Sequence, residues 1–425
     1  MKNRNYEGAL NKLHSLGVFG IKPGLERIKI LLKKIGNPEQ QIKCIHITGT
    51  NGKGSVRAML EGMLVASGYK VGKFTSPHLV SYNERMVVQK QQIADREFAD
   101  LVYEICHCAT DMTKDMQPTQ FEVLTAMAFL YFARQKVDLA IIEVGMGGLL
   151  DSTNVITPIC SIITNVSLDH MDKCGDSIEK IAVHKAGIIK KNIPVITAAT
   201  AEALDIIRET ASKYQAPLYI AGKDFYCQEI SKSLLGQKIK YFAGKEEVEF
   251  EMKLLGKHQL TNSAVAITAF KLITKGQKMQ AIASGLKETI WSGRAEIISQ
   301  DPVIILDGAH NPAGAIALRE LLDDELLRAK RKCFILGFMQ DKLIIEIVNI
   351  LCKKEDTIIV VNAAPDLSRS ASPEQLKQLI QAPTILMHDY QQAILKAKEV
   401  VGKEGLVCIA GSLYLVGNIK KTLLQ

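Results

Sequence analysis

The feature that most constrains the fold is a place where a strand-like segment, a glycine-rich turn and a helix-like segment follow one another. Residues 42–48 (IKCIHIT) are typical of a buried strand, GTNGKGS occupies 49–55, and apolar side chains then recur at helical spacing up to residue 70. Residues 71–77 (VGKFTSP) predict a second strand. Strand, helix and strand in fewer than 40 residues predict a βαβ unit, and therefore a parallel sheet.

The same alternation continues along the chain and predicts an α/β fold with two domains. Short alternating pieces between residues 225 and 255 indicate a small antiparallel patch, and WSGRAE at 291–296 has the character of a hinge. Beyond it the strand–helix rhythm restarts for about 130 residues, a usual domain size. We therefore predict an N-terminal domain over 1–294, with a mostly parallel phosphate-loop-type sheet and helices on both faces, and a Rossmann-like C-terminal domain over 295–425.

Composition narrows the class of protein. The net charge of +8 comes from scattered lysines with no long basic run, which disfavours nucleic acid as a partner and suits a small anionic substrate. The nine cysteines form no C-x-x-C pair, so reduced thiols in a cytoplasmic chain are expected. The first residues lack an apolar signal core, and no run of 18 apolar residues occurs, which disfavours secretion and membrane spanning.

The glycine-rich turn predicts a phosphate-binding loop. It does not match G-x-x-x-x-G-K-[ST] strictly, because Gly54 separates Lys53 from Ser55. Glycines nevertheless let backbone N–H groups turn toward an anion, and the following helix offers its positive N-terminus. Lys53 can neutralise phosphate charge. The alternative is a simple strand-to-helix turn with a surface lysine, which the position between a strand and a helix disfavours.

Polar residues just past several strands suggest where a metal would bind. Ligands of a parallel sheet gather at the C-terminal ends of its strands. Ser76 and His78 follow one predicted strand, Glu143 closes another, and Asp169 and His170 follow a third. Each alone is best explained as an ordinary polar residue at a strand end. Together with the glycine loop they suggest oxygen ligands for Mg²⁺.

Motifs spread along nearly the whole chain resemble those of one enzyme family. They occur in the order KPGLERI, GTNGKGS, TSPHL, ERMVV, FEVLTAMAF, EVGMGGLLDSTN, ITNVSLDH, HKAGIIK, KHQLTNSAVAI, WSGRAE, LDGAHNP and GSLYLVG. This set resembles the folylpolyglutamate synthase/dihydrofolate synthase family, a branch of the Mur-type ATP-dependent amide ligases. The glycine loop alone would suggest only the wider superfamily.

The resemblance implies a nucleotide and metal site. The residues that would hold ATP are Thr50, Asn51, Gly52, Lys53, Gly54, Ser55, Asn262, Arg294 and Asp307. Ser76, Glu143 and His170 would bind Mg²⁺, with two ions expected, and Lys185 would carry a carbamate that also serves the metal. The catalytic set is then Lys53, His170, Lys185 and Arg294. From the residues alone, Lys185 would be interpreted as a solvent-facing helix lysine. For Arg294 the alternative, which its place at the hinge disfavours, is a linker arginine that pairs with Glu296 or with solvent.

The resemblance also implies where the other substrates bind. The pterin-bearing acceptor would contact Lys22, Pro23, Gly24, Leu25, Thr119, Gln120, Phe121, Leu150, Asp151 and Ser152. His310 and Ser412 would help to hold glutamate, although His310 could equally be a turn residue. The chain departs from the family pattern at Leu149, where an arginine is common, and at His184, where an acid is usual.

The reaction implied is ATP-driven amide formation. The γ-phosphoryl group would activate a carboxylate of a folate or of dihydropteroate, and the amine of L-glutamate would displace the phosphate, in a monomeric enzyme with small-molecule partners only. Arg294 at the hinge could reach the γ-phosphate when domains close. Two alternatives remain: another Mur-type ligase, disfavoured because only about forty residues precede the loop where a UDP-binding domain would stand, and a phosphate-loop NTPase switch.

Overall fold

The computed structural model describes residues 5–17, 23–169, 171–364 and 368–424. The chain divides into two compact units. The first comprises Met1–Tyr226, Tyr241–Glu247 and Asn262–Leu286, and the second comprises Cys227–Lys240, Val248–Thr261 and Lys287–Gln425. The long segment of the second unit thus begins at Lys287. A domain boundary at residues 294 and 295 stays a prediction.

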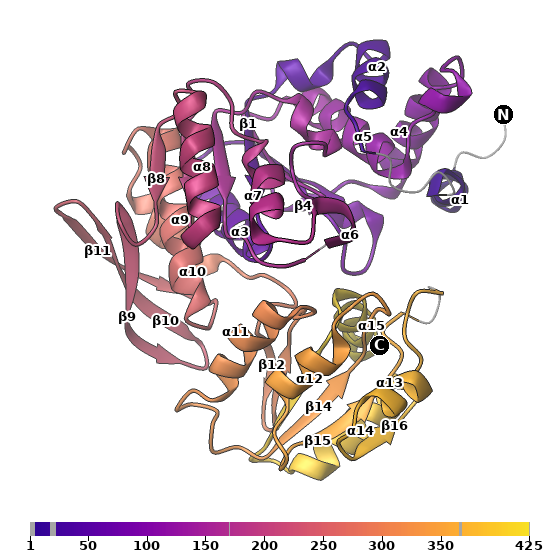
Figure 1. The fold of residues 1–425 in the computed structure, drawn as a ribbon, viewed down its shortest axis with the longest axis vertical. Helices are drawn as coiled ribbons and strands as arrows, with labels where there is room; N and C mark the ends of the chain where they lie inside the picture. Colours follow the sequence, from indigo (N-terminus) through magenta and orange to yellow (C-terminus); the bar gives the residue numbers. More distant parts are fainter. Residues whose placement is uncertain (1–4, 18–22, 170, 365–367, 425) are drawn as a thin grey trace. The chain divides into compact units, whose positions relative to one another are not determined.

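The first unit contains a large sheet with the strand order β4-β3-β2-β5-β1-β6-β7-β8 (Figure 1). The bounds are β1 Cys44–Thr48, β2 Val71–Phe74, β3 Met86–Val88, β4 Gln91–Gln92, β5 Leu139–Glu143, β6 Cys160–Ile163, β7 Val195–Thr197 and β8 Leu218–Ile220. Strands from β2 across to β8 pair in parallel, and β3 and β4 add an antiparallel edge. Every residue of the central β1 is buried, which explains its mostly apolar sequence.

Helices cover both faces of this sheet. They are α1 Tyr6–Leu16, α2 Glu26–Lys34, α3 Lys53–Ala66, α4 Asp95–Cys108, α5 Gln120–Arg134, α6 Met171–Cys174, α7 Ile178–Ala186, α8 Ala201–Lys213, α9 His258–Thr274 and α10 Gln280–Glu288. Buried side chains of α5 share a core with Ile142 of β5. The next residue, Glu143, points to the opposite face and is bound by Arg57 of α3. The central strands are therefore enclosed between α5 and α3.

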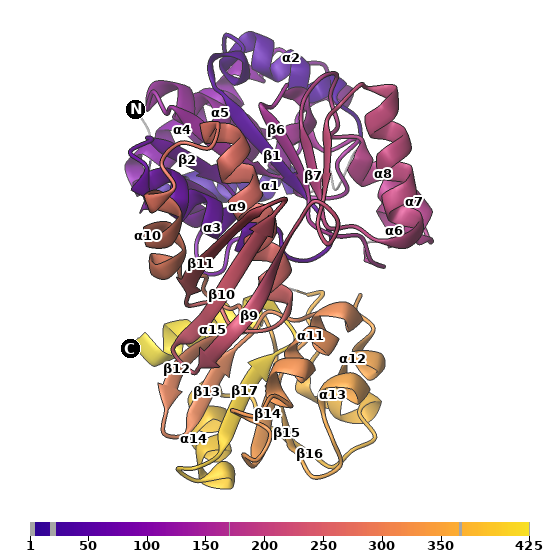
Figure 2. The same ribbon diagram turned by 90° about the vertical axis from the view of Figure 1, so that its left-hand side faces the viewer.

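A small sheet and a second α/β sheet complete the fold (Figure 2). The small sheet has the order β11-β10-β9, with bounds β9 Phe225–Ser233, β10 Gly236–Ala243 and β11 Glu246–Met252. Each strand is joined to the next by a two-residue connection, which is long enough only for antiparallel pairing. This is the predicted antiparallel patch.

The second unit has the sheet order β12-β13-β17-β14-β15-β16. The strands are β12 Glu296–Gln300, β13 Val303–Leu306, β14 Lys332–Leu336, β15 Thr357–Val360, β16 Thr384–Leu386 and β17 Leu406–Ala410, and the helices are α11 Pro312–Leu322, α12 Ile344–Leu351, α13 Pro373–Leu379, α14 Tyr390–Val401 and α15 Leu413–Leu424. Only β12 among the described strands of this sheet is antiparallel to its neighbour. The predicted α/β class is confirmed in both units.

Candidate active site

The glycine loop connects β1 to α3 in a conformation that only small residues permit. Gly49 has φ 150° and Gly52 has φ 84°. A side chain at Gly49 would collide with the Thr164 hydroxyl, and a Cβ on Gly52 would lie 2.5 Å from Asn262 Oδ1. The structure therefore brings Asn262, predicted as a nucleotide contact, against the loop.

The segment that follows β6 fixes the loop by hydrogen bonds. The Thr50 N–H donates to the Asn165 carbonyl at 3.0 Å, and the Asn51 N–H donates to Asn165 Oδ1 at 2.8 Å. The Thr50 hydroxyl donates to the Ser167 carbonyl at 3.0 Å. Because α3 begins at Lys53, this fixed loop leads directly into a helix N-terminus, whose partial positive charge favours an anion.

Lys53 and Lys185 face the same small space. Lys53 Nζ donates to the carbonyls of Gly49 at 2.7 Å and Thr50 at 3.1 Å, so its ammonium group folds back over the loop. An enclosed cavity of about 20 Å³ is lined by both lysines and by Asp169. That volume holds about one water molecule.

Lys185 is 5% exposed, so the interpretation of it as a solvent-facing helix lysine is wrong. Burial lowers its pKa to about 7, and the nearby charge of Lys53 acts in the same direction. A large fraction of this side chain is therefore a neutral amine near pH 7.

Only one of the two carboxylate oxygens of Glu143 accepts the hydrogen bonds that hold this side chain. Its Oε2 accepts from Arg57 Nε at 3.1 Å and from the Thr75 hydroxyl at 2.7 Å. Thr75 lies beside it because Phe74 of β2 is in register with Ile142 of β5. The next hydroxyl, on Ser76, is buried and has no hydrogen-bond partner. Ser76 and Glu143 thus lie at the C-terminal ends of two neighbouring parallel strands, and their role as metal ligands stays a prediction.

Arg57 and Thr75 are not among the residues predicted for the site. For Arg57 the available signal was an arginine in a mostly apolar helix, four residues after Lys53, where a fully buried charge requires a partner. His170 lies outside the described residues. Within the described part of the chain, no group of three or more His, Cys, Asp and Glu side chains could hold a metal ion.

Two of the predicted acceptor segments meet beside β5. Gly145 packs so closely against the Phe121 ring that a side chain there would collide with it, and the same Cβ would lie 3.1 Å from Asp151 Oδ2. The Ser152 hydroxyl hydrogen-bonds the Thr125 hydroxyl of α5 at 2.8 Å. Asp151 is buried, which raises its pKa, and Leu150 beside it is 42% exposed.

The third acceptor segment is tied to α5 by a buried ion pair. Arg27 of α2 lies 3.1 Å from Glu122, which also caps the start of α5 by accepting from the N–H and hydroxyl of Thr119. Gln120 donates to the Tyr82 hydroxyl at 2.9 Å. Pro23, Gly24 and Leu25 precede α2, and Lys22 lies outside the described residues.

The second unit brings together the predicted residues that follow its strands. Asp307 Oδ2 accepts from the Ala295 N–H at 2.7 Å and its Oδ1 from the Ala309 N–H at 2.8 Å. Burial raises the Asp307 pKa, and the neighbouring charge of Arg294 opposes that rise. His310 Nδ1 pairs with the Gly308 carbonyl at 2.7 Å.

Two further residues of this unit were considered from the sequence: Ser412 as a contact for glutamate, and Glu296 as a partner for Arg294. Ser412 is buried at the end of β17, and its hydroxyl accepts from the Tyr414 N–H at 3.1 Å. The preceding Gly411 N–H donates to the Ala309 carbonyl at 2.9 Å. Glu296, weighed as a partner for Arg294, accepts from Lys420 at 2.6 Å.

Comparison with known proteins relates this arrangement to others. The Mur ligase middle domain matches residues 47–270, and the dihydrofolate synthetase C-terminal domain matches residues 292–423. The dihydrofolate synthase/folylpolyglutamate synthase of Bacillus subtilis is 37% identical over 431 residues, covering 98% of this chain and 99% of the relative. The chain belongs to the folylpolyglutamate synthase/dihydrofolate synthase family.

Solved structures of the family have the same fold over the full length. Folylpolyglutamate synthase from Thermotoga maritima has a TM-score of 0.85 and 34% identity, covering 99% of this chain and 97% of that one. FolC from E. coli, solved in complex with DHPP and ADP, has a TM-score of 0.89 and 28% identity, with coverage of 99% and 97%. The family relation therefore holds for both units.

The two departures from the family pattern are neighbours in space. The Leu149 N–H donates to the His184 carbonyl at 2.7 Å, and the Leu149 side chain packs against Gly187. Leu149 is 39% exposed. An apolar side chain therefore stands where the motif resemblance leads us to expect an arginine.

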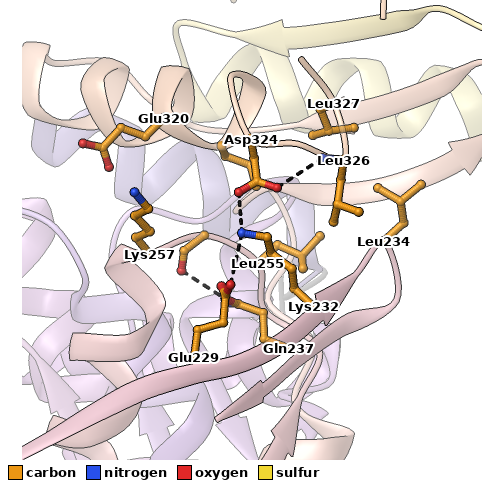
Figure 3. A pocket seen from close by; sticks show the side chains of 12 residues that line it. Glu229, Lys232, Leu234, Gln237, Leu255, Lys257, Glu320, Asp324, Leu326 and Leu327 are labelled. Carbon is orange, nitrogen blue, oxygen red and sulfur yellow. Dashed lines mark hydrogen bonds and ion pairs between the residues drawn. The ribbon is translucent and has the colours of Figure 1, made fainter. Parts of the chain in front are cut away.

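A further pocket in the second unit is lined by none of the residues predicted for this family's site. Lys232 lies between Glu229 and Asp324 (Figure 3). Its ammonium nitrogen is 3.1 Å from a Glu229 carboxylate oxygen and 2.5 Å from one of Asp324. Gln237 donates to the Leu254 carbonyl at 2.6 Å. The cavity measures about 20 Å³ and its central charges are paired, so it offers little to a ligand.

In the part of the chain that the structure describes, no helix combines the length and the apolar character needed to span a bilayer.

Proposed function

We propose that this chain is an ATP-dependent ligase that joins L-glutamate to a carboxyl group of a folate or of dihydropteroate. The observation that carries the proposal is the fixed glycine loop between β1 and α3, with Lys53 folded over it, in a chain similar over its whole length to folylpolyglutamate and dihydrofolate synthases. We also propose that it works as a monomer in the cytoplasm.

ATP would be held by its phosphates at residues 50–55. Thr50 and Asn51 are fixed through their own hydrogen bonds, so the loop does not have to be reorganised when the nucleotide binds. Lys53 would move its ammonium group from the loop carbonyls to phosphate oxygens. Asn262 would contact the nucleotide beside Gly52, and Arg294 and Asp307 would serve it from the second unit.

The residues at the sheet edge fit Mg²⁺. Ser76 offers a buried hydroxyl without a partner, and both hydrogen bonds of Glu143 fall on Oε2, so that Oε1 can serve as a ligand. Hydroxyl and carboxylate oxygens are what this cation prefers. Ser76, Glu143 and His170 would hold it, with two ions in all. Bound Mg²⁺ would neutralise phosphate charge.

Lys185 is suited to carbamate formation because its amine is buried and substantially neutral. The neutral amine would attack CO₂ and lose one proton, which gives a carbamate with one negative charge. The product would then attract a cation where an ammonium group would repel it.

The chain's own residues would position three substrates for two transfers. The acceptor would lie along residues 22–25, 119–121 and 150–152, and glutamate would lie near His310 and Ser412. The acceptor carboxylate takes the γ-phosphoryl group of ATP, which leaves ADP and an acyl phosphate. The glutamate amine then attacks the carbonyl carbon, loses a proton and releases phosphate. Exclusion of water protects the acyl phosphate.

The test is a purified-enzyme assay with ATP, glutamate and either dihydropteroate or tetrahydrofolate. We expect ADP and a glutamylated product in equal amounts, and one ¹⁸O atom from a labelled acceptor carboxylate in the released phosphate. Rapid ATP hydrolysis that needs neither acceptor nor glutamate would instead support the NTPase switch. Ligation of a different carboxylate, with no folate or pteroate product, would support another Mur-type ligase.

A further inference from the structure

A buried chain of three polar side chains runs from the central strand to the acceptor side of the first unit. His46 of β1 and Thr153 are both fully buried. His46 Nε2 lies 2.9 Å from Thr153 Oγ1, and Thr153 Oγ1 lies 2.5 Å from Asp151 Oδ1. The proposed nucleotide and metal chemistry uses neither His46 nor Thr153.

The hydrogen-bond partners fix the direction of this chain. Asp151 accepts N–H groups from the backbone on both oxygens, Thr153 on Oδ1 at 3.0 Å and Met146 on Oδ2 at 2.9 Å. Burial raises the Asp151 pKa, and these hydrogen bonds oppose that rise. Because backbone N–H groups donate to both oxygens, the carboxylate is the form that fits all of these contacts, and the Thr153 hydroxyl gives its single hydrogen to Oδ1. The Thr153 oxygen can then only accept a hydrogen from His46.

The state of His46 agrees with this direction. Burial lowers its pKa to about 3, with a smaller effect from the charge of Lys190, so the ring is neutral and carries one N–H. Nδ1 has no hydrogen-bond partner. The network therefore assigns the hydrogen to Nε2, which donates to Thr153.

We propose that His46, acting through Thr153, is a positioning residue that holds Asp151 ionised and oriented for the acceptor substrate. The inference rests on the proposed function, in which Asp151 contacts the acceptor. A buried carboxylate is costly unless donors surround it, and the His46–Thr153 pair supplies one of these donors from a side chain. An ionised Asp151 only accepts hydrogen bonds, so the matching part of the acceptor presents N–H or O–H groups.

The first test removes the hydroxyl without changing the size of the side chain. We expect Thr153→Val to raise the KM for the acceptor about tenfold, the effect of a lost charge-assisted hydrogen bond, with the KM for ATP changed less than about twofold. Thr153→Ser restores the hydroxyl and should bring the acceptor KM back toward wild type. Thr268→Val, which removes a buried hydroxyl from α9, is the matched control and should leave both constants unchanged.

The second test changes the donor. Gln can place a side-chain N–H where His46 has Nε2, whereas Leu cannot, so His46→Gln should retain acceptor binding that His46→Leu loses. Circular dichroism and thermal melting show whether each variant folds. For a variant that does not fold, the ¹⁵N spectrum of histidine-labelled wild-type enzyme gives the answer, since it reports the tautomer of His46 directly.

These measurements separate the two proposals. If wild-type enzyme glutamylates neither dihydropteroate nor a folate, the proposed function fails, whatever the tautomer of His46. The positioning role is overturned by an unchanged acceptor KM in Thr153→Val, by equal rises in the KM of ATP and acceptor, or by an Nδ1–H tautomer in the wild-type spectrum.

Discussion

The two sides of the first unit's site are held in different ways. The glycine loop is fixed mainly by its backbone, through hydrogen bonds to Asn165 and Ser167. The acceptor side is built from side chains, with Glu122, Asp151 and Thr153 each engaged by several partners. A backbone site is sensitive to residues that change the path of the chain, and a side-chain site is sensitive to the loss of single polar groups. The predictions below test that contrast.

The largest effect is expected at the loop. Gly49→Ala would force a side chain into Thr164, and we expect a loss in kcat/KM for ATP of at least about 100-fold, because small displacements in such sites are costly. Gly276→Ala is the control, since Gly276 also has positive φ but nothing within 4 Å of its added Cβ. Equal losses in both variants would show that strain, and not the collision, is responsible.

Lys185→Ala should abolish ligation, and added bicarbonate should not restore it. Because burial lowers the Lys185 pKa to about 7 from the ordinary lysine value, the neutral amine that reacts with CO₂ predominates above pH 7 and is lost as the pH falls below it. Carbon-13 NMR with labelled bicarbonate should therefore show a carbamate signal at pH 8 that fades by pH 6. Near-normal turnover by Lys185→Ala would show that ligation does not need a carbamate on this residue.

Thr75→Val should weaken metal binding while the fold is retained. The variant loses the hydroxyl that holds Glu143 Oε2, and we expect about a tenfold lower affinity for Mn²⁺ used in place of Mg²⁺, measured by electron paramagnetic resonance with nucleotide present. Thr75→Ser keeps the hydroxyl and serves as the comparison. Wild-type affinity in Thr75→Val would mean that Arg57 alone orients Glu143.

The smallest effect on substrate binding is expected at Leu149, where the chain departs from the family pattern. Leu149→Arg returns a cation to a position that is 39% exposed, where solvent screens charge. We expect the KM for an anionic acceptor to fall by no more than about threefold, and the gain to disappear at high salt. A gain that persists in 1 M salt would point to a direct contact with the acceptor.

Sequence alone predicts the parallel core well and its edges poorly. The segments around β1, β5 and β17 are mostly apolar because both faces of these strands are buried, so they are easily recognised. By contrast, β4 is exposed and two residues long. The partly exposed edge strand β12 was not predicted as a strand, and the predicted hinge at 291–296 overlaps it only at Glu296. Edge strands carry little apolar pattern, and only their pairing reveals them.

The residues of the site also differ in how well the sequence predicts them. Residues in the glycine loop and at strand ends can be found from their position in the chain, and family resemblance added Lys185, Asp151 and Asn262. The supporting partners Thr75 and His46 could not be found in this way, because a hydrogen bond between distant segments leaves no local pattern. An arginine in a mostly apolar helix indicates that Arg57 has a buried partner, but it does not identify Glu143 as that partner. Glu143 and Arg57 are separated by 86 residues in sequence.

The proximity of Lys53 and Lys185 has a consequence for how the protein responds to ligands. Burial and the charge of Lys53 both disfavour a positive charge on Lys185 across one small cavity, which costs the folded protein stability. An anion, such as a nucleotide phosphate, that settles between the two lysines relieves that cost. We therefore expect a higher melting temperature with ATP than with adenosine, because only ATP brings phosphate groups that bind the folded protein at this position.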